Sequence, residues 1–172
     1  MIENLKVLYS EEEIQKRIDE LAEEIDKDYE GKEVVGICVL KGAVFFTVDL
    51  VRKMKTPVDL EFMQISSYLG TESTGVVNLK KDLEVSIEGK DVLVIEDIVD
   101  SGNSMKFLLD YLKTKNPKSL RLATLLDKKE KRKVEVNIDY TGFVIPNKFI
   151  IGYGFDIDEK CRDIPYLGYI EQ

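Results

Sequence analysis

The chain has 172 residues, with 25 lysines and arginines against 33 aspartates and glutamates, a net charge of −8, and no histidine. The absence of histidine excludes serine–histidine–aspartate triads, histidine-ligated haem and histidine-based zinc sites. A chain of this length normally forms one domain, and 44% hydrophobic residues are enough for one sizeable core. We therefore expect a globular protein with a single domain over residues 1–172.

Neither export nor membrane insertion is expected. No apolar run approaches the roughly 18 residues of a membrane span, and the first ten residues lack the basic-then-apolar pattern of a signal peptide. Cys38 and Cys161 have no C-x-x-C spacing, so neither a disulfide framework nor a thiolate metal site is indicated. The acidic balance disfavours nucleic acid, and the basic run at 128–133 is interpreted as a solvated turn. The sequence thus predicts a cytoplasmic protein without membrane or nucleic-acid partners.

Two helices are expected in the first third of the chain. The first begins at Ser10, whose S-x-x-E capping box is completed by Glu13, and Gly31 lies just past its end. Residues 43–53 are apolar enough to pack a second helix on a sheet, and Pro57 blocks further helix after it. The first helix has one apolar face, formed by Ile14, Ile18, Leu21 and Ile25.

Strands alternate with these helical patterns. Residues 58–62 alternate between polar and apolar, and residues 76–85 resume a strand-like pattern. Between them, residues 64–75 are small and polar, which is typical of a mobile loop. Four β-rich apolar runs predict strands buried on both faces: residues 34–40, 92–95, 120–126 and 149–151. This alternation is that of an α/β domain.

The most informative stretch, residues 91–112, reads as a buried strand, an acidic loop, a small-residue turn and a helix. The helix would point its N-terminus out of the carboxyl edge of the sheet, where open α/β sheets bind ligands. The N-terminus of a helix carries a partial positive charge and free N–H groups, which favour the binding of a phosphate. The turn residues are Ser101, Gly102, Asn103 and Ser104. The alternative is that Ser101 or Ser104 simply caps the helix.

Three carboxylates precede this turn within five residues: Glu96, Asp97 and Asp100. Like charges packed together destabilise one another, but a divalent cation or the hydroxyls of a ribose would make the cluster tolerable. A solvated acidic loop is the alternative. Neither G-x-x-x-x-G-K-[ST] nor G-x-G-x-x-G occurs, so the P-loop and dinucleotide fingerprints are absent. The remaining pattern outlines a site for a phosphorylated ribose.

Residues 92–102 (VLVIEDIVDSG) resemble the phosphoribosyl-pyrophosphate loop of the type I phosphoribosyltransferases. Similar motifs follow the family order along nearly the whole chain: LKGA at 40–43, SSY at 66–68, LLDK at 125–128, IPNKF at 145–149 and GYGFD at 152–156. The resemblance is strongest to the branch that acts on hypoxanthine and guanine. It implies a mostly parallel twisted sheet flanked by helices, a flexible active-site loop, and a small hood formed by the N-terminal segment and residues from about 128 to 172.

The resemblance also implies an activity. Members of this branch salvage purines by transferring the 5-phosphoribosyl group of phosphoribosyl pyrophosphate to N9 of a 6-oxopurine, with Mg²⁺ as cofactor. Relatives are homodimers or homotetramers, and the same is expected here. By position, Asp100 is the catalytic base facing N7 of the purine. Glu96 and Asp97 would meet the ribose hydroxyls and the metal, and Ser101 to Ser104 would bind the 5′-phosphate.

The remaining site residues are also implied by the resemblance. Lys41, Gly42 and Arg162 would bind pyrophosphate, and in this family the Leu40–Lys41 peptide can be cis. Lys128 would donate to the purine O6, Phe149 would stack on the base, and the backbone of Ile150 would read its edge. Asp156 is placed at the purine side and near a second metal. Ser67 and Tyr68 belong to the lid loop. Without the resemblance, Lys128 is a surface lysine and Phe149 ordinary core.

Three other functions remain open. A phosphoribosyltransferase for xanthine or another base would share the ribose-phosphate loop and differ only in the base pocket. A regulatory relative that binds RNA would need a basic face, which the net charge of −8 disfavours. A nucleotide-binding module without catalysis is disfavoured by the presence of Asp100.

Overall fold

The computed structural model describes residues 4–67 and 77–170. Its strands are β1 (Leu5–Tyr9), β2 (Val34–Leu40), β3 (Val58–Ser67), β4 (Val77–Lys81), β5 (Asp91–Val99), β6 (Ser119–Asp127), β7 (Tyr140–Val144), β8 (Ile150–Ile151) and β9 (Leu167–Ile170). Its helices are α1 (Glu11–Asp28), α2 (Val44–Lys53), α3 (Asn103–Lys113) and the 3₁₀ turn η1 (Lys129–Lys131). The predicted alternation of helices and strands is confirmed.

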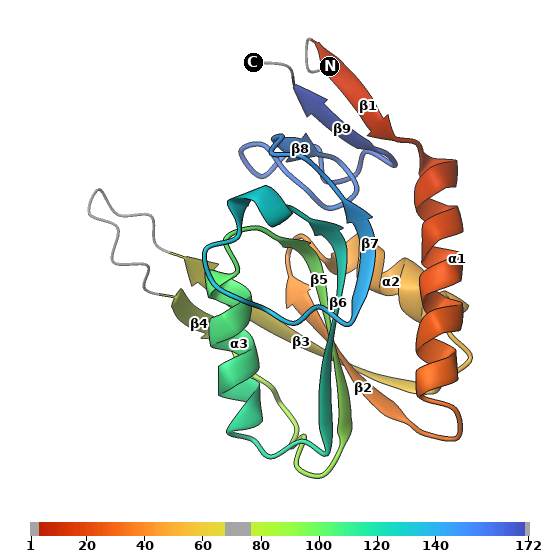
Figure 1. Cartoon of the computed structure of the whole chain (residues 1–172), viewed down its shortest axis with the longest axis vertical. Helices are drawn as coiled ribbons and strands as arrows, with labels where there is room; N and C mark the ends of the chain where they lie inside the picture. Colours follow the sequence, from red (N-terminus) through yellow and green to blue (C-terminus); the bar gives the residue numbers. More distant parts are fainter. Residues whose placement is uncertain (1–3, 68–76, 171–172) are drawn as a thin grey trace.

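Two sheets are present in the described ranges. Six strands form the larger one in the order β4-β3-β2-β5-β6-β7, in which only β4 runs antiparallel to its neighbour. Three strands form a small antiparallel sheet in the order β1-β9-β8, so the two ends of the chain pair with each other. Figure 1 shows this small sheet above the carboxyl ends of the parallel strands, over the loops that follow them.

Helix α1 begins where its capping box predicts. The Ser10 hydroxyl accepts a hydrogen bond from the Glu13 N–H (3.2 Å), and the Glu13 carboxylate accepts one from the Ser10 N–H (2.8 Å). These two bonds satisfy donors that a helix start otherwise leaves free. The apolar face of α1 is fully buried, as the spacing predicts.

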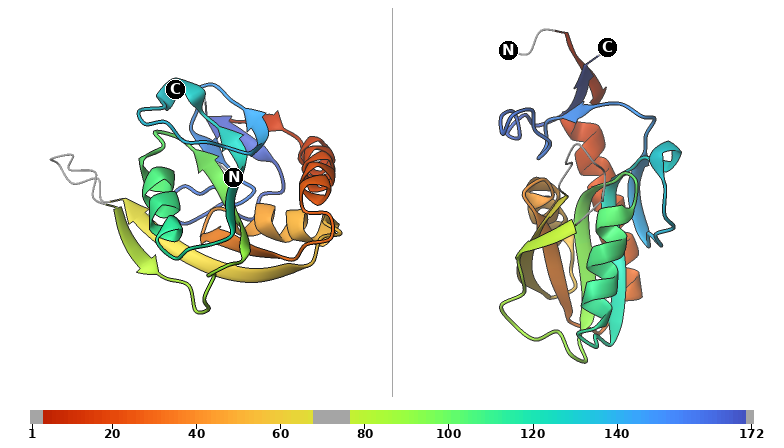
Figure 2. Two further views of the ribbon diagram at one scale, coloured as in Figure 1. Left: turned by 60° about the horizontal axis from the view of Figure 1, so that its bottom comes forward. Right: turned by 90° about the vertical axis from the view of Figure 1, so that its left-hand side faces the viewer.

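The central strands are buried because helices cover both faces of the large sheet. On one face, α1 and α2 pack against alternate strand residues such as Leu93 and Ile95. On the other, α3 packs through Met105, Leu108 and Leu112 against the intervening residues, including Val92 and Val94. Figures 1 and 2 show β5 and β6 running between α3 and α1. This two-sided burial explains why these strands are continuous apolar runs.

Several sequence expectations need correction. Residues 64–67 continue β3 rather than starting a loop, and the strand expected over 76–85 ends at Lys81. The run 149–151 is not a strand buried on both faces, because only Ile150 and Ile151 form β8, in the small sheet, and Phe149 is 52% exposed. Residues 140–144, inside the range expected for the hood, form the edge strand of the large sheet.

The basic run at 128–133 is only partly a solvated turn. Lys129, Lys131 and Lys133 are exposed, but Lys128 is buried and Arg132 is half-buried. Within the described ranges, every helix is too short or too polar to cross a membrane.

Candidate active site

Two loops meet where the strand order changes direction, between β2 and β5. The loop after β2 carries Lys41 and Gly42, and the Leu40–Lys41 peptide is cis, as the resemblance implied. Gly42 lies directly against the carboxyl end of β5, because a Cβ atom at this position would lie 1.8 Å from an oxygen of Asp97. Adjacent parallel strands whose connections leave in opposite directions form the usual ligand crevice of such sheets.

Glu96, which is buried, and Asp97, which is half-buried, form an acidic pair at the end of β5. Burial and the neighbouring Asp97 carboxyl raise the pKa of Glu96 well above its usual value. Burial also raises the pKa of Asp97, although hydrogen bonds from Glu96 and the Ile98 N–H and the charge of Arg162 oppose this. Ionisation of both carboxyl groups is therefore unfavourable without a counter-charge, and a bound cation would favour it.

The turn after β5 leads into α3 through Gly102, which is the N-cap and has a left-handed φ of 89°. Gly102 has no side chain with which to cap α3, but the Ser101 hydroxyl accepts a hydrogen bond from the Asn103 N–H, the first of the helix (3.3 Å). The alternative to a phosphate site, capping by a serine, is therefore met in part by Ser101. The turn lines a polar cavity of about 260 Å³ together with Gly42, Glu96, Asp97 and Asp100.

Asp100 and Lys128 lie opposite each other, with 4.0 Å between Lys128 Nζ and Asp100 Oδ2. Burial lowers the pKa of Lys128, and the charge of Asp100 opposes that shift. The other carboxylate oxygen of Asp100, Oδ1, is buried and has no hydrogen-bond partner among the described residues. A buried acceptor without a partner is costly, which indicates that a ligand satisfies it.

A second cavity, of about 430 Å³, begins on the other side of Lys128. It is lined by Lys128, Lys148, Phe149 and Tyr169, among others. The exposed ring of Phe149 therefore lies at a cavity wall rather than in the core, while Ile150 next to it is buried. Asp100 lines the first cavity and Lys128 the second, so their 4.0 Å contact marks the junction between the two.

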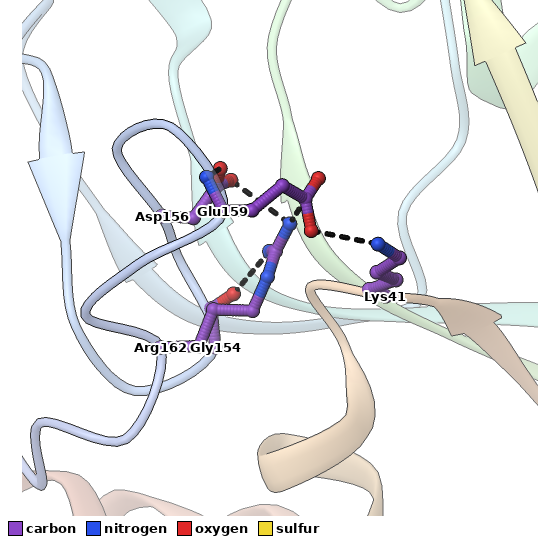
Figure 3. Close-up of polar contacts among 5 residues, drawn as sticks. All are labelled: Lys41, Gly154, Asp156, Glu159 and Arg162. Carbon is purple, nitrogen blue, oxygen red and sulfur yellow. Dashed lines mark hydrogen bonds and ion pairs between the residues drawn. The ribbon is translucent and has the colours of Figure 1, made fainter.

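Arg162 and Lys41 share an acidic neighbour, Glu159 (Figure 3), and Lys41 lies between Leu40 and Gly42, which line the first cavity. Lys41 Nζ lies 2.6 Å from a Glu159 oxygen, and Arg162 contacts both Asp156 (3.0 Å) and Glu159 (3.4 Å). Arg162 also donates to the Gly154 carbonyl (2.7 Å), which fixes the guanidinium within the loop after β8. Asp156 thus lies among the cations, and it is not among the residues that line the second cavity.

Most predicted site residues come together at this edge of the sheet. Ser67 is the last residue of β3, and Tyr68 lies outside the described residues. Sequence reasoning missed Glu159 and Arg132, of which Arg132 ion-pairs with the buried Asp127. The pairing of Glu159 with Lys41 joins residues 118 positions apart, and no local pattern indicates it.

Comparisons with known proteins agree with this geometry. Residues 5–158 match the family model of the phosphoribosyl transferase domain. A hypoxanthine-guanine phosphoribosyltransferase of Dictyostelium discoideum is 51% identical over 97% of this chain and 96% of its own length. The bifunctional protein TilS/HprT of Listeria monocytogenes is 48% identical over 96% of this chain, but the chain spans only 26% of that protein.

A solved structure gives the same result for the fold. The hypoxanthine phosphoribosyltransferase of Trypanosoma cruzi, in complex with the product IMP, is 40% identical and superposes with a TM-score of 0.92 over 99% of this chain and 97% of that one. The fold is that of the type I phosphoribosyltransferases, as the sequence predicts. The chain belongs to the phosphoribosyltransferase family.

Proposed function

We propose that the chain transfers the 5-phosphoribosyl group of phosphoribosyl pyrophosphate to N9 of hypoxanthine or guanine, giving IMP or GMP and pyrophosphate in purine salvage. The observation that carries this proposal is the pair Asp100–Lys128, which stands at the junction of a polar cavity and an aromatic-lined one. The names of the relatives and the IMP bound to the Trypanosoma cruzi enzyme support the choice of base.

Lys128 favours a 6-oxopurine over adenine. A protonated lysine has three donors and no acceptor, so it pairs with the 6-oxo group and not with a 6-amino group. Phe149 offers its exposed ring at the wall of the same cavity, where a purine would stack on it. The buried backbone of Ile150 follows and would read the edge of the base.

Asp100 is the proposed general base. Its buried oxygen without a partner would accept the proton that the purine loses when N9 forms its new bond. The bond between C1 of the ribose and pyrophosphate breaks with charge developing on the sugar, so holding N9 in line with that bond is the second requirement. Lys128, which contacts Asp100, would orient the purine both for proton transfer to Asp100 and for attack by N9.

The start of α3 would hold the 5′-phosphate. The turn Ser101 to Ser104 presents main-chain N–H groups and two hydroxyls at the positive end of an 11-residue helix. Gly102 lets the backbone approach because its left-handed conformation suits a glycine.

Glu96 and Asp97 fit a Mg²⁺ ion that is shared with the substrate. No group of three or more acidic, histidine or cysteine side chains among the described residues forms a complete metal site. Mg²⁺ usually takes one or two carboxylates together with substrate oxygens, so an acidic pair beside a phosphate site suits it. When bound, the ion would neutralise charge on the leaving pyrophosphate. We also propose that Asp156, which contacts Arg162, lies near a second ion.

Lys41, Gly42 and Arg162 would bind the pyrophosphate. Arg162 presents a planar fork that matches a phosphate, and Lys41 adds a point charge. Both cations are paired with Glu159, so pyrophosphate would replace this carboxylate. We propose that Ser67, at the end of β3, helps to close the site and exclude water; Tyr68, the other predicted lid residue, lies outside the described residues.

We further propose that the protein is a cytoplasmic homodimer or homotetramer. Phe45 and Val48 lie one turn apart on α2 and remain 40% and 42% exposed. Apolar surface of this kind is common at contacts between subunits. The phosphorylated substrate is an anion that does not cross a bilayer, which places the reaction inside the cell. Light scattering of the purified chain measures the assembly directly.

The function is tested with a panel of bases. The purified chain is incubated with phosphoribosyl pyrophosphate, Mg²⁺ and, separately, hypoxanthine, guanine, xanthine, adenine and uracil. We expect turnover with hypoxanthine or guanine. The Lys128→Gln variant should lose this turnover, whereas Lys129→Gln, a change at the exposed neighbouring residue, should keep it. Turnover confined to xanthine, adenine or uracil would contradict the assigned base, and no turnover with any base would contradict the activity.

A further inference from the structure

The segment that follows β6 runs alongside the loop that carries Asp100. The Lys128 N–H donates to the Val99 carbonyl (3.0 Å), and the N–H groups of Lys133 and Val134 donate to the Ser101 carbonyl (2.9 and 3.2 Å). We call residues 127–134 the brace segment. It holds the main chain on both sides of Asp100.

Arg132 adds the side-chain part of this contact. One guanidinium nitrogen donates to the carboxylate of Asp127, and Nε donates to the main-chain carbonyl of Asp100 (3.2 Å). Asp127 is 3% exposed, and a buried carboxylate is stable only with a partner. A planar guanidinium binds a carboxylate and a carbonyl together in a fixed geometry, whereas an ammonium is a single mobile point charge.

The brace segment leaves no free space against the loop. A Cβ atom added at Gly102 would lie 3.0 Å from Arg132 Cδ and 2.8 Å from the Val134 carbonyl oxygen. The loop therefore packs directly on Arg132. Because packed groups of this kind have few alternative positions, a change at Arg132 moves the loop.

We propose that Arg132 is a positioning residue for the transfer reaction: with Asp127 it fixes the main chain of Asp100, so that the Asp100 carboxyl faces the base. This inference rests on the proposed function, in which Asp100 is the general base. Arg132 acts through the loop that carries Asp100 and does not itself contact the substrates. It differs in this respect from the exposed lysines of the same run, which contribute charge to the surface.

Kinetics separate positioning from binding. A displacement of about 1 Å at a reacting group costs on the order of 10²-fold, so Arg132→Met is expected to lower kcat about 100-fold. The KM for phosphoribosyl pyrophosphate should change by less than kcat, because Lys41 and Arg162 are untouched and only the turn at Gly102 packs on Arg132. The matched control is Lys133→Met, which loses the same charge from the same segment and keeps its main-chain bond to Ser101; its kcat should stay within about twofold.

A second variant separates loss of positioning from loss of folding. Arg132→Lys retains a cation for Asp127 and loses the fork, so it should melt near the wild-type temperature and still lose on the order of tenfold in kcat. Wild-type kcat in both Arg132 variants would overturn the proposal. So would a loss that appears only in KM.

Hydrogen exchange gives a readout that does not depend on activity. The amides of residues 99–104 should exchange faster in Arg132→Met than in the wild type, and at the wild-type rate in Lys133→Met. Unchanged exchange in Arg132→Met would overturn the positioning role. A wild-type chain that forms no nucleotide would instead refute the proposed function, and the exchange comparison would still decide whether Arg132 holds the loop.

Discussion

The purine side and the pyrophosphate side of the site are built differently. On the purine side, main-chain hydrogen bonds hold Lys128 and both neighbours of Asp100, and the Lys128 and Asp100 side chains are 8% and 43% exposed. On the pyrophosphate side, the Lys41 and Glu159 side chains are 53% and 65% exposed and form an ion pair, while Arg162 is bound to the Gly154 carbonyl (Figure 3). The purine side is thus held mainly by main-chain contacts, whereas the pair Lys41–Glu159 is a contact that water and salt weaken.

This difference fits the two tasks. A general base that accepts one proton must already be positioned against the purine before the reaction, because correct positioning lowers the activation barrier. Cations that receive a highly charged leaving group gain from a temporary partner, because unpaired like charges close together are unfavourable. Glu159 is such a partner, and it lies in a segment where Asp158, Glu159 and Cys161 all have a positive φ.

The largest expected effect is on the purine side. Asp100→Asn removes the proposed base and should lower kcat by about 10²- to 10⁴-fold, with little change in the KM for phosphoribosyl pyrophosphate. Steady-state kinetics with hypoxanthine measure both quantities. Asp110→Asn, on the exposed face of α3, is the control and should be close to wild type. A fully active Asp100→Asn enzyme would remove Asp100 from the mechanism.

Gly102→Ala tests how tightly the turn after β5 packs on the brace segment. A left-handed alanine costs about 1–2 kcal/mol, and here its Cβ also meets the Val134 carbonyl at 2.8 Å. Gly89→Ala is a matched control, since Gly89 has φ 69° and no atom within 4 Å. Urea denaturation should show a larger loss of stability for Gly102→Ala, accompanied by weaker IMP binding. Equal losses would mean that the loop has room to move.

The pH dependence of base binding tests Lys128. Because burial lowers its pKa, Lys128 loses its proton at a lower pH than the ordinary lysine value of about 10.4. As the pH rises, kcat/KM for hypoxanthine should therefore begin to decrease before the ordinary lysine pKa of about 10.4 is reached. Lys128→Gln should have a low kcat/KM without this alkaline limb. An identical limb in the variant would assign it to another group.

The smallest effect is expected on the pyrophosphate side. Hydrogen bonding to Lys41 lowers the pKa of Glu159, so the carboxylate is charged at neutral pH and competes with pyrophosphate. Glu159→Gln should tighten binding of inorganic pyrophosphate with Mg²⁺ by about two- to fivefold, a modest change typical of exposed pairs. Titration calorimetry measures it. Glu84→Gln removes an exposed pair of the same 2.6 Å length away from the site and should have no effect. Weaker binding in Glu159→Gln would make Glu159 a ligand rather than a competitor.

Local patterns predicted the main elements well. The run 34–40 coincides with β2, the capping box starts α1, and the apolar spacing after Met105 gives the buried face of α3. These features are readable because burial on one or both faces imposes a period on the sequence. The acidic cluster before α3 was equally clear.

Long-range pairing was not readable in the same way. The strands β1 and β9 are short, lie at opposite ends of the chain and stabilise each other only after folding. Arg132 looked like part of a solvated basic run, yet its partners are Asp127 and the carbonyl of Asp100. Phe149 looked like a buried strand residue and instead lines a cavity. In each case a distant partner, absent from the local pattern, decides the environment.

The stoichiometry of the reaction is the most direct test of the proposed phosphoribosyl transfer. The purified chain, phosphoribosyl pyrophosphate, Mg²⁺ and hypoxanthine are mixed, and IMP and pyrophosphate are both quantified over time. The proposed transfer forms the two products in equal amounts, and only when hypoxanthine is present. Release of pyrophosphate without IMP, or binding of both substrates without either product, would contradict it.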